Sequence, residues 1–324
     1  KQLAQVLCLH QFSVVREGAQ PGFDNIDGTG AFRVVRSRKK RREIRFRRFE
    51  NHFAGPPYLE SMRLRWYTGT DSEARAYQSG RAQFSQAGDV AFAGHRAKYR
   101  TQVAEGPATI LKFVGFGKNL ADNLEFKRQF VVALGKNSFV NVGSGEQVLA
   151  PAAPFSIPLS SDNASSNYKS LSSTAPETNR KSLDVVFDIT RPGDRAVAEK
   201  IVAAVFQLGW NAKIVALPTE SFAERIGRQS ASLFIGELVL PPSISLQNEL
   251  LRKLTGGTLA ASPFELGAEQ AQPLLLSRMH FIPLFRRSVR VHYQSNLRGL
   301  RFGPFGNLNL GDLFVFGGAQ RNPS

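Results

Sequence analysis

Three short apolar runs that alternate with two helical patterns constrain the fold of this chain more than any other feature of its sequence. The runs are residues 183–189, 213–217 and 232–238, and they are rich in Val, Ile, Leu and Phe. Such runs are typical of buried strands. Between them, residues 194–208 and 219–226 place apolar side chains at helical spacing. This order predicts a right-handed, parallel βαβαβ unit in an α/β protein.

Residues at the ends of these elements predict where each helix starts and where a ligand would lie. Asp194 and Thr219 are expected to cap the two helices, and Gly209 is expected to end the first. In sheets of this kind, ligands bind beyond the carboxyl ends of the strands. Glu237, close to the end of the third strand, is therefore a candidate ligand-binding residue. A second interpretation stays open, in which Glu237 only pairs with a nearby arginine.

The first third of the chain has a different pattern. Apolar and basic residues alternate in residues 44–47 and 62–66, which is typical of half-buried strands with arginines on the solvated face. A dense basic run, residues 36–42, is predicted to form the tip of a hairpin. Residues 70–80 predict one helix, with polar residues at its start and a glycine at its end.

The charge balance raises the question of a nucleic-acid partner. The 324-residue chain has 42 Lys and Arg against 26 Asp and Glu, a formal net charge of +16. A basic cluster such as residues 36–42 can follow a phosphate backbone. No zinc finger, RNA-recognition signature or helix-turn-helix accompanies it, however. We therefore expect a solvated strand face and no nucleic-acid partner.

The sequence contains no recognisable catalytic or metal-binding motif. The five histidines lack the spacing of metal ligands, Cys8 is the single cysteine, and no G-x-S-x-G segment is present. We therefore expect neither an enzyme nor a bound metal or cofactor. No stretch approaches the roughly 18–20 apolar residues of a membrane span. The polar tract 160–181 has no apolar periodicity and is predicted to be a flexible loop.

Several segments along the chain resemble, in order, the motifs of one protein family. They are similar to the GTGPF, RNPxYW, PYLD, SGEVD, VRQAL, IPLYH and LKGL elements of family 5 extracellular solute-binding proteins, the peptide and nickel binders of ABC importers. The corresponding segments here are Gly28–Val35, Ile44–Phe53, Gly55–Trp66, Ala74–Phe84, Phe126–Leu134, Ile282–Phe285 and Leu297–Gly306. Each motif is short, and it is their shared order that carries the resemblance.

The resemblance implies an α/β fold of the periplasmic binding protein type II kind, with two lobes. Lobe I would comprise residues 1–114 and 289–324, and lobe II would comprise residues 115–288, with the βαβαβ unit at 183–238. Family members normally carry well over a hundred residues before the first motif, whereas 27 precede Gly28 here. We therefore expect lobe I to be incomplete at its N-terminus, as in a C-terminal portion or a reduced relative.

The resemblance also implies where a solute would be held. In the family, the third strand of the βαβαβ unit leads into a stretch whose aspartate holds the α-amino group of a peptide. No aspartate follows Glu237 here, so Glu237 is the candidate for the cationic end of a solute. Phe285 and Arg286, which follow the Ile282-Pro283-Leu284 segment, are expected to line the opposite wall.

Two functions are compatible with the resemblance. The first is the solute-binding component of an ABC importer, which captures a peptide or similar small solute by closing two lobes and delivers it to a membrane permease. Such a protein would be a periplasmic or extracellular, membrane-associated monomer, with its signal sequence upstream of Lys1. The second is a regulatory or interaction protein that reuses the fold as a ligand sensor linked to nucleic-acid binding. The motif order favours the first function, and the basic run favours the second.

Overall fold

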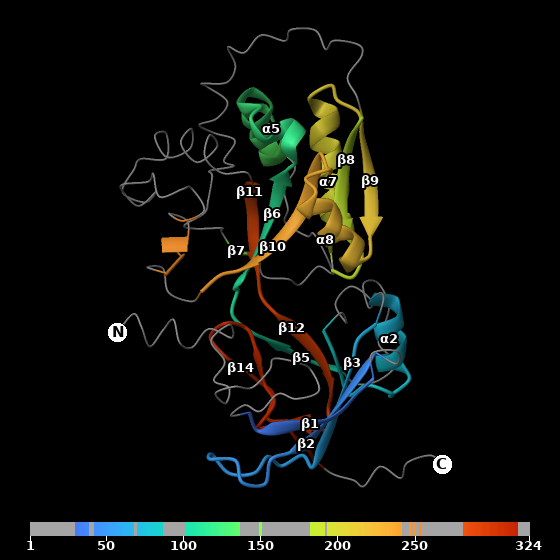
Figure 1. Ribbon diagram of the computed structural model, residues 1–324, viewed down its shortest axis with the longest axis vertical. Helices are drawn as coiled ribbons and strands as arrows, with labels where there is room; N and C mark the ends of the chain where they lie inside the picture. Colours follow the sequence, from blue (N-terminus) through green and yellow to red (C-terminus); the bar gives the residue numbers. More distant parts are fainter. Residues whose placement is uncertain are drawn as a thin grey trace. The chain divides into compact units, whose positions relative to one another are not determined.

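The computed structural model divides the chain into two compact units (Figure 1). The first unit joins residues 1–107 to residues 290–324, and the second is continuous from 108 to 289. The structure describes residues 30–38, 42–67, 70–86, 101–136, 149–150, 182–191, 193–241, 246–247, 249–250, 253 and 281–316. None of the helices in this part of the chain has the length and hydropathy needed to cross a membrane.

The second unit is built on one six-stranded sheet. Its strands, in spatial order, are β7 (Leu149–Ala150), β11 (Phe281–Arg287), β6 (Ile110–Phe116), β10 (Leu233–Val239), β8 (Leu183–Asp188) and β9 (Ala212–Leu217). Strands β8, β9 and β10 are parallel, whereas β6 runs antiparallel to β10 and β11. The parallel strands are connected by α7 (Asp194–Gln207) and α8 (Thr219–Gly227). The predicted βαβαβ unit is therefore confirmed.

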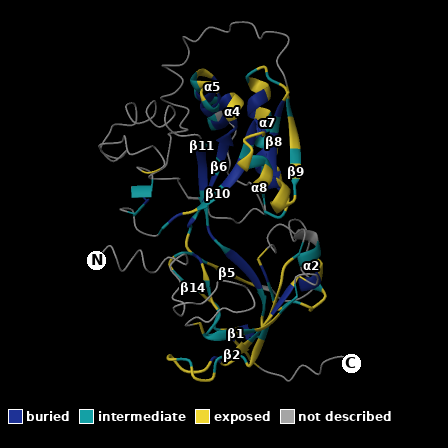
Figure 2. Cartoon of the chain, viewed as in Figure 1, coloured by how far each residue is buried: buried dark blue, intermediate teal, exposed yellow. Residues whose placement is uncertain are grey.

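Helices cover both faces of this sheet. Val185 belongs to a core cluster with residues of α7 and of α5 (Leu124–Lys136), which follows the short α4 (Lys118–Ala121). The next residue, Val186, packs with Phe222 of α8. Successive side chains of a strand point to opposite faces, so α8 lies on the face opposite α5 and α7. Figure 2 shows the same layering, with strands β6, β8, β10 and β11 largely buried and helices that expose their outer sides.

The two helices begin differently from the predicted caps. Gly193, with a φ of 80°, occupies the N-cap position of α7, and Asp194 is the buried first residue of that helix. The second helix follows Pro218, and the Thr219 hydroxyl donates to Asp188 instead of capping the helix. Both predicted caps thus place their side chains in a polar network. Gly209 follows the end of α7 with a φ of 73°, as predicted.

The first unit contains two three-stranded antiparallel sheets and several short elements. The first sheet has the order β1 (Phe32–Arg38), β2 (Glu43–Arg48) and β3 (Ser61–Arg65), and the second has the order β4 (Phe84–Ser85), β12 (Arg290–Gln294) and β5 (Thr101–Glu105). Helix α2 (Thr70–Gln78) precedes β4. Two short strand pairs are β13 (Leu297–Arg298) with β16 (Phe314–Val315) and β14 (Arg301–Phe302) with β15 (Leu308–Asn309).

The alternation predicted for the basic strands is present in β2. Ile44 is buried and Phe46 half-buried, whereas Arg45 and Arg47 between and after them are exposed. β1 and β2 pair as a hairpin, with Arg38 opposite Glu43. The arginines therefore lie on the solvated face of a sheet that turns its apolar residues to the other side.

The division between the units differs from the expected lobe boundary. A boundary between residues 114 and 115 would cut β6, and the chain divides after Pro107 and before Arg290 instead. Phe302, from the C-terminal segment, packs against Gly106 within the first unit. That the two units are the two lobes of the family stays a prediction. The tract 160–181, expected to be a flexible loop, lies outside the described residues.

Candidate functional site

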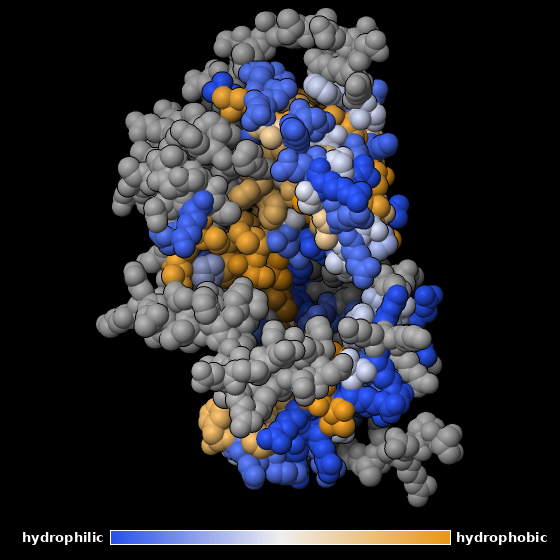
Figure 3. Space-filling model, in the orientation of Figure 1, coloured by the Kyte–Doolittle hydropathy of each residue, from blue (hydrophilic) through white to orange (hydrophobic). Residues whose placement is uncertain are grey.

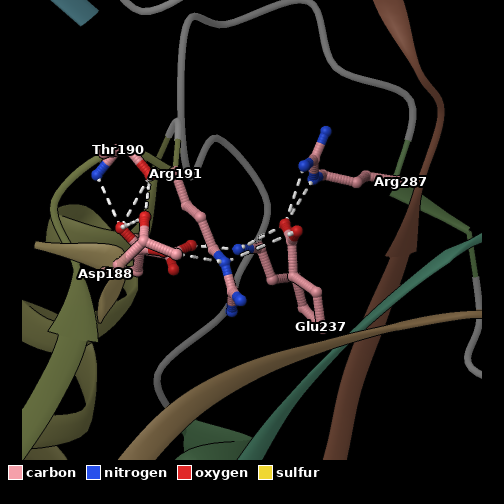
Figure 4. A network of polar contacts seen from close by, with 8 residues as sticks. Asp188, Thr190, Arg191, Glu237 and Arg287 are labelled. Atoms are coloured by element: carbon pink, nitrogen blue, oxygen red, sulfur yellow. Dashed lines mark hydrogen bonds and ion pairs between the residues drawn. The ribbon is translucent and has the colours of Figure 1, made fainter. Parts of the chain in front are cut away.

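A network of charged side chains lies at the carboxyl ends of β8 and β10 in the second unit (Figure 4). Its members come from segments that are far apart in the sequence, so the topology of the sheet brings them together. The cations are Lys112, Arg191 and Arg287, the anions are Asp188, Asp194 and Glu237, and the hydroxyl groups are those of Thr190 and Thr219.

Glu237 is the centre of this network. Its Oε1 lies 2.6 Å from Lys112 Nζ and accepts a hydrogen bond from Arg287 Nη2 at 2.7 Å. The antiparallel pairing of β10 with β6 places Lys112 directly opposite Glu237. Burial alone would raise the pKa of Glu237, but Lys112 and Arg287 together lower it to about 2. Glu237 is therefore ionised throughout the physiological pH range.

A second carboxyl group lies deeper, at the start of α7. Asp194 accepts a hydrogen bond from Lys112, and both side chains are almost completely buried. Burial raises the pKa of Asp194 to about 6, although the charge of Lys112 opposes this shift. Asp194 Oδ2 has no hydrogen-bond partner among the residues that the structure describes. The network thus contains one carboxyl group that titrates close to neutral pH.

Asp188 fixes the loop that leaves β8. Its Oδ1 accepts hydrogen bonds from the backbone N–H of Thr190 at 2.9 Å and from the Thr190 hydroxyl at 2.7 Å. The Thr219 hydroxyl, from the start of α8, donates to the same oxygen at 3.1 Å. This carboxylate therefore ties the end of β8 to the start of α8 and positions the next residue of the loop, Arg191.

Arg191 is the least constrained cation of the network. Its Nε lies 3.5 Å from Asp188 Oδ2 and 4.0 Å from Glu237 Oε2, which are ion-pair distances longer than a hydrogen bond. Its side chain is 27% exposed, and its guanidinium also lies over the Phe222 ring. A guanidinium has five N–H donors, so Arg191 retains donors for a bound anion.

The structure brings together only part of the site expected from the sequence. Glu237 lies at the carboxyl end of its strand, as expected, but it already contacts Lys112 and Arg287. Phe285 is 6% exposed and belongs to the hydrophobic core, so little of its ring is available to a ligand. Arg286 lies opposite Leu111 in the sheet and faces the side away from Arg287. The arginine that reaches Glu237 is therefore the next residue along β11.

Sequence reasoning did not identify Lys112, Arg191 or Arg287 as site residues. A lysine in the middle of the apolar run 110–116 was a usable signal, because a lone charge in a buried strand needs a partner of opposite sign. The partner itself could not be identified, since it depends on which strand pairs with β6. Within the described residues, no group of three or more His, Cys, Asp and Glu side chains could hold a metal ion.

Solved structures match this chain over most of its length. The oligopeptide-binding protein AppA from Bacillus subtilis, in complex with a nonapeptide, has a TM-score of 0.66 and 12% identity, and the match covers 88% of this chain and 66% of AppA. A dipeptide-binding protein from Pseudoalteromonas sp. SM9913, in complex with Met-Leu, has a TM-score of 0.67 and 14% identity, with 97% and 68% covered.

A binding protein solved with a nickel complex matches equally well. NikA from Staphylococcus aureus, in complex with Ni(L-His)2, has a TM-score of 0.68 and 10% identity, and the match covers 94% of this chain and 72% of NikA. This chain spans about two thirds of the length of the two peptide-binding proteins. No protein-family model and no curated protein sequence matches it. The chain thus has the α/β fold of the peptide- and nickel-binding proteins, as the order of its motifs predicts.

Proposed function

We propose that this chain is the solute-binding component of an ABC importer and that it captures a peptide or similar small solute with free charged ends. The likeness in fold to binding proteins crystallised with a nonapeptide, with Met-Leu and with a nickel–histidine complex supports a binding role. In this role the protein works in the periplasm or outside the cell and delivers its solute to a membrane permease.

The contacts of Glu237 and Arg191 support a particular position for the solute. Glu237 Oε1 takes the short contacts with Lys112 and Arg287, whereas Oε2 lies 4.0 Å from Arg191 Nε. A carboxylate oxygen with bonding capacity thus lies beside a guanidinium with spare donors. This pair of opposite charges complements a solute that carries both an ammonium and a carboxylate group.

The position of the pair agrees with the physics of the fold. Arg191 follows β8 and Glu237 is near the end of β10, so both lie where open α/β sheets bind their ligands. Arg191 makes only loose ion pairs, at 3.5 Å to Asp188 and at 4.0 Å to Glu237. No short hydrogen bond between Arg191 and either carboxylate therefore has to break before the solute binds. We expect Arg191 to hold the carboxylate of the solute and Glu237 to hold its ammonium group.

Two substitutions and three forms of one short peptide test this assignment. Arg191→Gln should weaken the binding of the peptide with free ends about tenfold to a hundredfold, because one charge-assisted hydrogen bond is lost. It should have little effect on the peptide whose carboxyl end is amidated. Glu237→Gln should weaken the binding of the peptide with a free amino end and leave the binding of the acetylated peptide unchanged. Isothermal titration of each peptide against each protein measures these differences.

Arg195→Gln is the matched control for Arg191, because Arg195 lies on α7 of the same unit and pairs with Glu199 on the surface. It should leave all three peptides unaffected. If Arg191→Gln weakened the amidated peptide as strongly as the free one, Arg191 would not be the carboxylate contact.

A further inference from the structure

The β1–β2–β3 sheet of the first unit gathers arginines on one face. Directly opposed residues of antiparallel strands lie on the same face, so the pairing of these strands fixes its membership. Among the residues described here, seven arginines lie on this face together with Glu43 and Ser61. The arginines are Arg33, Arg36 and Arg38 of β1, Arg45 and Arg47 of β2, and Arg63 and Arg65 of β3. We call this surface the arginine face.

The arginine face carries far more positive charge than negative charge. Glu43 is its single carboxylate among the described residues, and it is shared by Arg45 at 2.6 Å, Arg65 at 2.9 Å and Arg63 at 3.8 Å. The hydrogen bond from Arg45 is the main cause that lowers the pKa of Glu43 to about 2. One negative charge cannot neutralise three guanidinium groups. The surplus is accessible, since the Arg63 side chain is 51% exposed and Arg47 is exposed too.

Apolar side chains are exposed at the edge of the same sheet. The connection from β2 to β3 leaves the sheet where Arg47 pairs with Ser61, and it carries Phe53, which is 84% exposed, and Tyr58, which is 74% exposed. The Tyr58 ring lies edge-on to Phe314, which is itself partly exposed. Figure 3 shows hydrophilic residues gathered over the end of the first unit where Figure 1 places β1 and β2, with hydrophobic ones beside them.

We propose that the arginine face binds the phosphate headgroups of an anionic lipid surface, with the aromatic side chains of the β2–β3 connection entering the interface. Basic residues near such a surface are attracted by its negative potential, and exposed aromatic rings prefer the boundary between water and hydrocarbon. The arginine face and the aromatic edge are thus complementary to the charged and apolar layers of a bilayer surface.

Nucleic acid fits this surface less well. Proteins that bind single strands stack successive bases on aromatic side chains along a basic groove, whereas the exposed Phe53 and Tyr58 lie at the edge of the arginine face and not among the residues that pair across β1, β2 and β3. The major groove of a duplex admits a helix or a two-stranded ribbon, whereas this surface is three strands wide.

Co-sedimentation of the full chain with lipid vesicles tests the proposal. The protein should sediment with vesicles of phosphatidylcholine in which about a quarter of the lipid is phosphatidylglycerol, and should stay in solution with phosphatidylcholine alone. Added salt should release it, because screening weakens the attraction. The double variant Arg47→Gln/Arg63→Gln should reduce the partition coefficient roughly twenty-five-fold, about fivefold for each arginine. Both changes leave the two short contacts of Glu43 intact.

The matched control is Arg195→Gln/Arg228→Gln, which removes the same charge from two exposed arginines of the second unit, one in α7 and one directly after α8. It should bind the anionic vesicles as the wild type does. An equal loss in both double variants would show attraction by net charge alone and would overturn the proposal. So would equal binding to the neutral vesicles, or binding of a DNA oligonucleotide that depends on Arg47 and Arg63 while vesicle binding does not. Phe53→Ser keeps the charge and should still weaken vesicle binding.

Discussion

Glu237 holds Lys112 and Arg287 through one carboxylate oxygen, so its replacement takes this partner from the largely buried Arg287 and leaves Lys112 with Asp194 alone. We predict that Glu237→Gln lowers the free energy of unfolding by about 3 kcal/mol, since breaking a buried ion pair from one side costs roughly 3–5 kcal/mol. Urea denaturation measures this loss.

Glu199→Gln provides the comparison for this prediction. Glu199 also pairs with an arginine, but both side chains are exposed, so its loss should cost less than about 1 kcal/mol. Losses of equal size in the two variants would show that the Glu237 network does not contribute to stability beyond a surface ion pair.

Asp194 should give the second unit an unusual dependence on pH. Its pKa is raised from 3.8 to about 6, so the folded protein binds this proton more tightly than the unfolded chain does. The contribution of this group to stability therefore increases as the pH falls from about 7 towards 5. Asp194→Asn removes the titrating group, so the difference in stability between wild type and variant should change across this range. A constant difference in urea midpoint from pH 7 to pH 5 would contradict the prediction.

The contribution of Glu237 to stability has the opposite dependence on pH, and it changes at lower pH. Its pKa is lowered from 4.5 to about 2, so its contribution is present above about pH 4.5 and is lost as the pH falls through 2. The two carboxyl groups of one network thus dominate separate pH ranges, which allows their effects to be separated in the same titration.

At the scale of elements, the contact between β6 and β10 depends on a glycine opposite an aromatic residue. Gly236 lies directly opposite Phe113, and a Cβ at position 236 would overlap the Phe113 ring. We predict that Gly236→Ala destabilises the protein by about 1–3 kcal/mol. Combining it with Phe113→Leu should recover part of this loss. Thermal or urea unfolding of the single and double variants checks the prediction.

Gly227, the last residue of α8, is the control for Gly236. Nothing lies within 4 Å of a Cβ built there, and its φ is not positive. Gly227→Ala should therefore be neutral or stabilise the protein by up to about 1 kcal/mol. A similar loss at both positions would show that the ring of Phe113 is not the cause.

The βαβαβ unit could be predicted from the sequence because its signals are local. The apolar run 183–189 and the helical spacing after Asp194 are properties of neighbouring residues, and the structure has both elements at these places. The role of Asp194 could not be predicted in the same way. An aspartate before a helix is usually a cap, and only the sheet pairing that brings Lys112 beside it gives it a buried partner.

The faces of the β11 residues could not be predicted from the sequence either. The sequence Phe285-Arg286-Arg287 does not reveal which arginine faces Glu237, because β11 has an irregularity between Pro283 and Phe285 that changes its register. A shift of one residue exchanges the faces of the strand. That Phe285 and Arg286 line the wall opposite Glu237, as the resemblance implies, stays a prediction, and the arginine that contacts Glu237 is Arg287.

At the scale of the whole molecule, the second unit is continuous in sequence, whereas the first is made from two separate segments. The second unit also contains a large core cluster of its own, built from β6, β8, β10, β11, α5 and α7. We predict that residues 108–289 fold when expressed alone. Circular dichroism should show a cooperative urea transition for this fragment. A fragment without such a transition would mean that its core depends on the first unit.

The fold of the whole chain was predictable only through the order of its motifs, since no single motif is long enough to specify it. Solved binding proteins that match this chain at 10–14% identity have the fold that the order of the motifs predicts. What the chain binds depends instead on a few charged groups, and Arg191 and Glu237 are the two on which the proposed function rests.

Isothermal titration of a short peptide into the full chain tests that function most directly. We predict saturable binding of a dipeptide or tripeptide with free ends, and a loss of roughly a hundredfold or more when the same peptide is acetylated and amidated, because two charge-assisted contacts disappear together. Binding of the capped peptide with the same affinity as the free one, or no binding of any free peptide, would contradict the account.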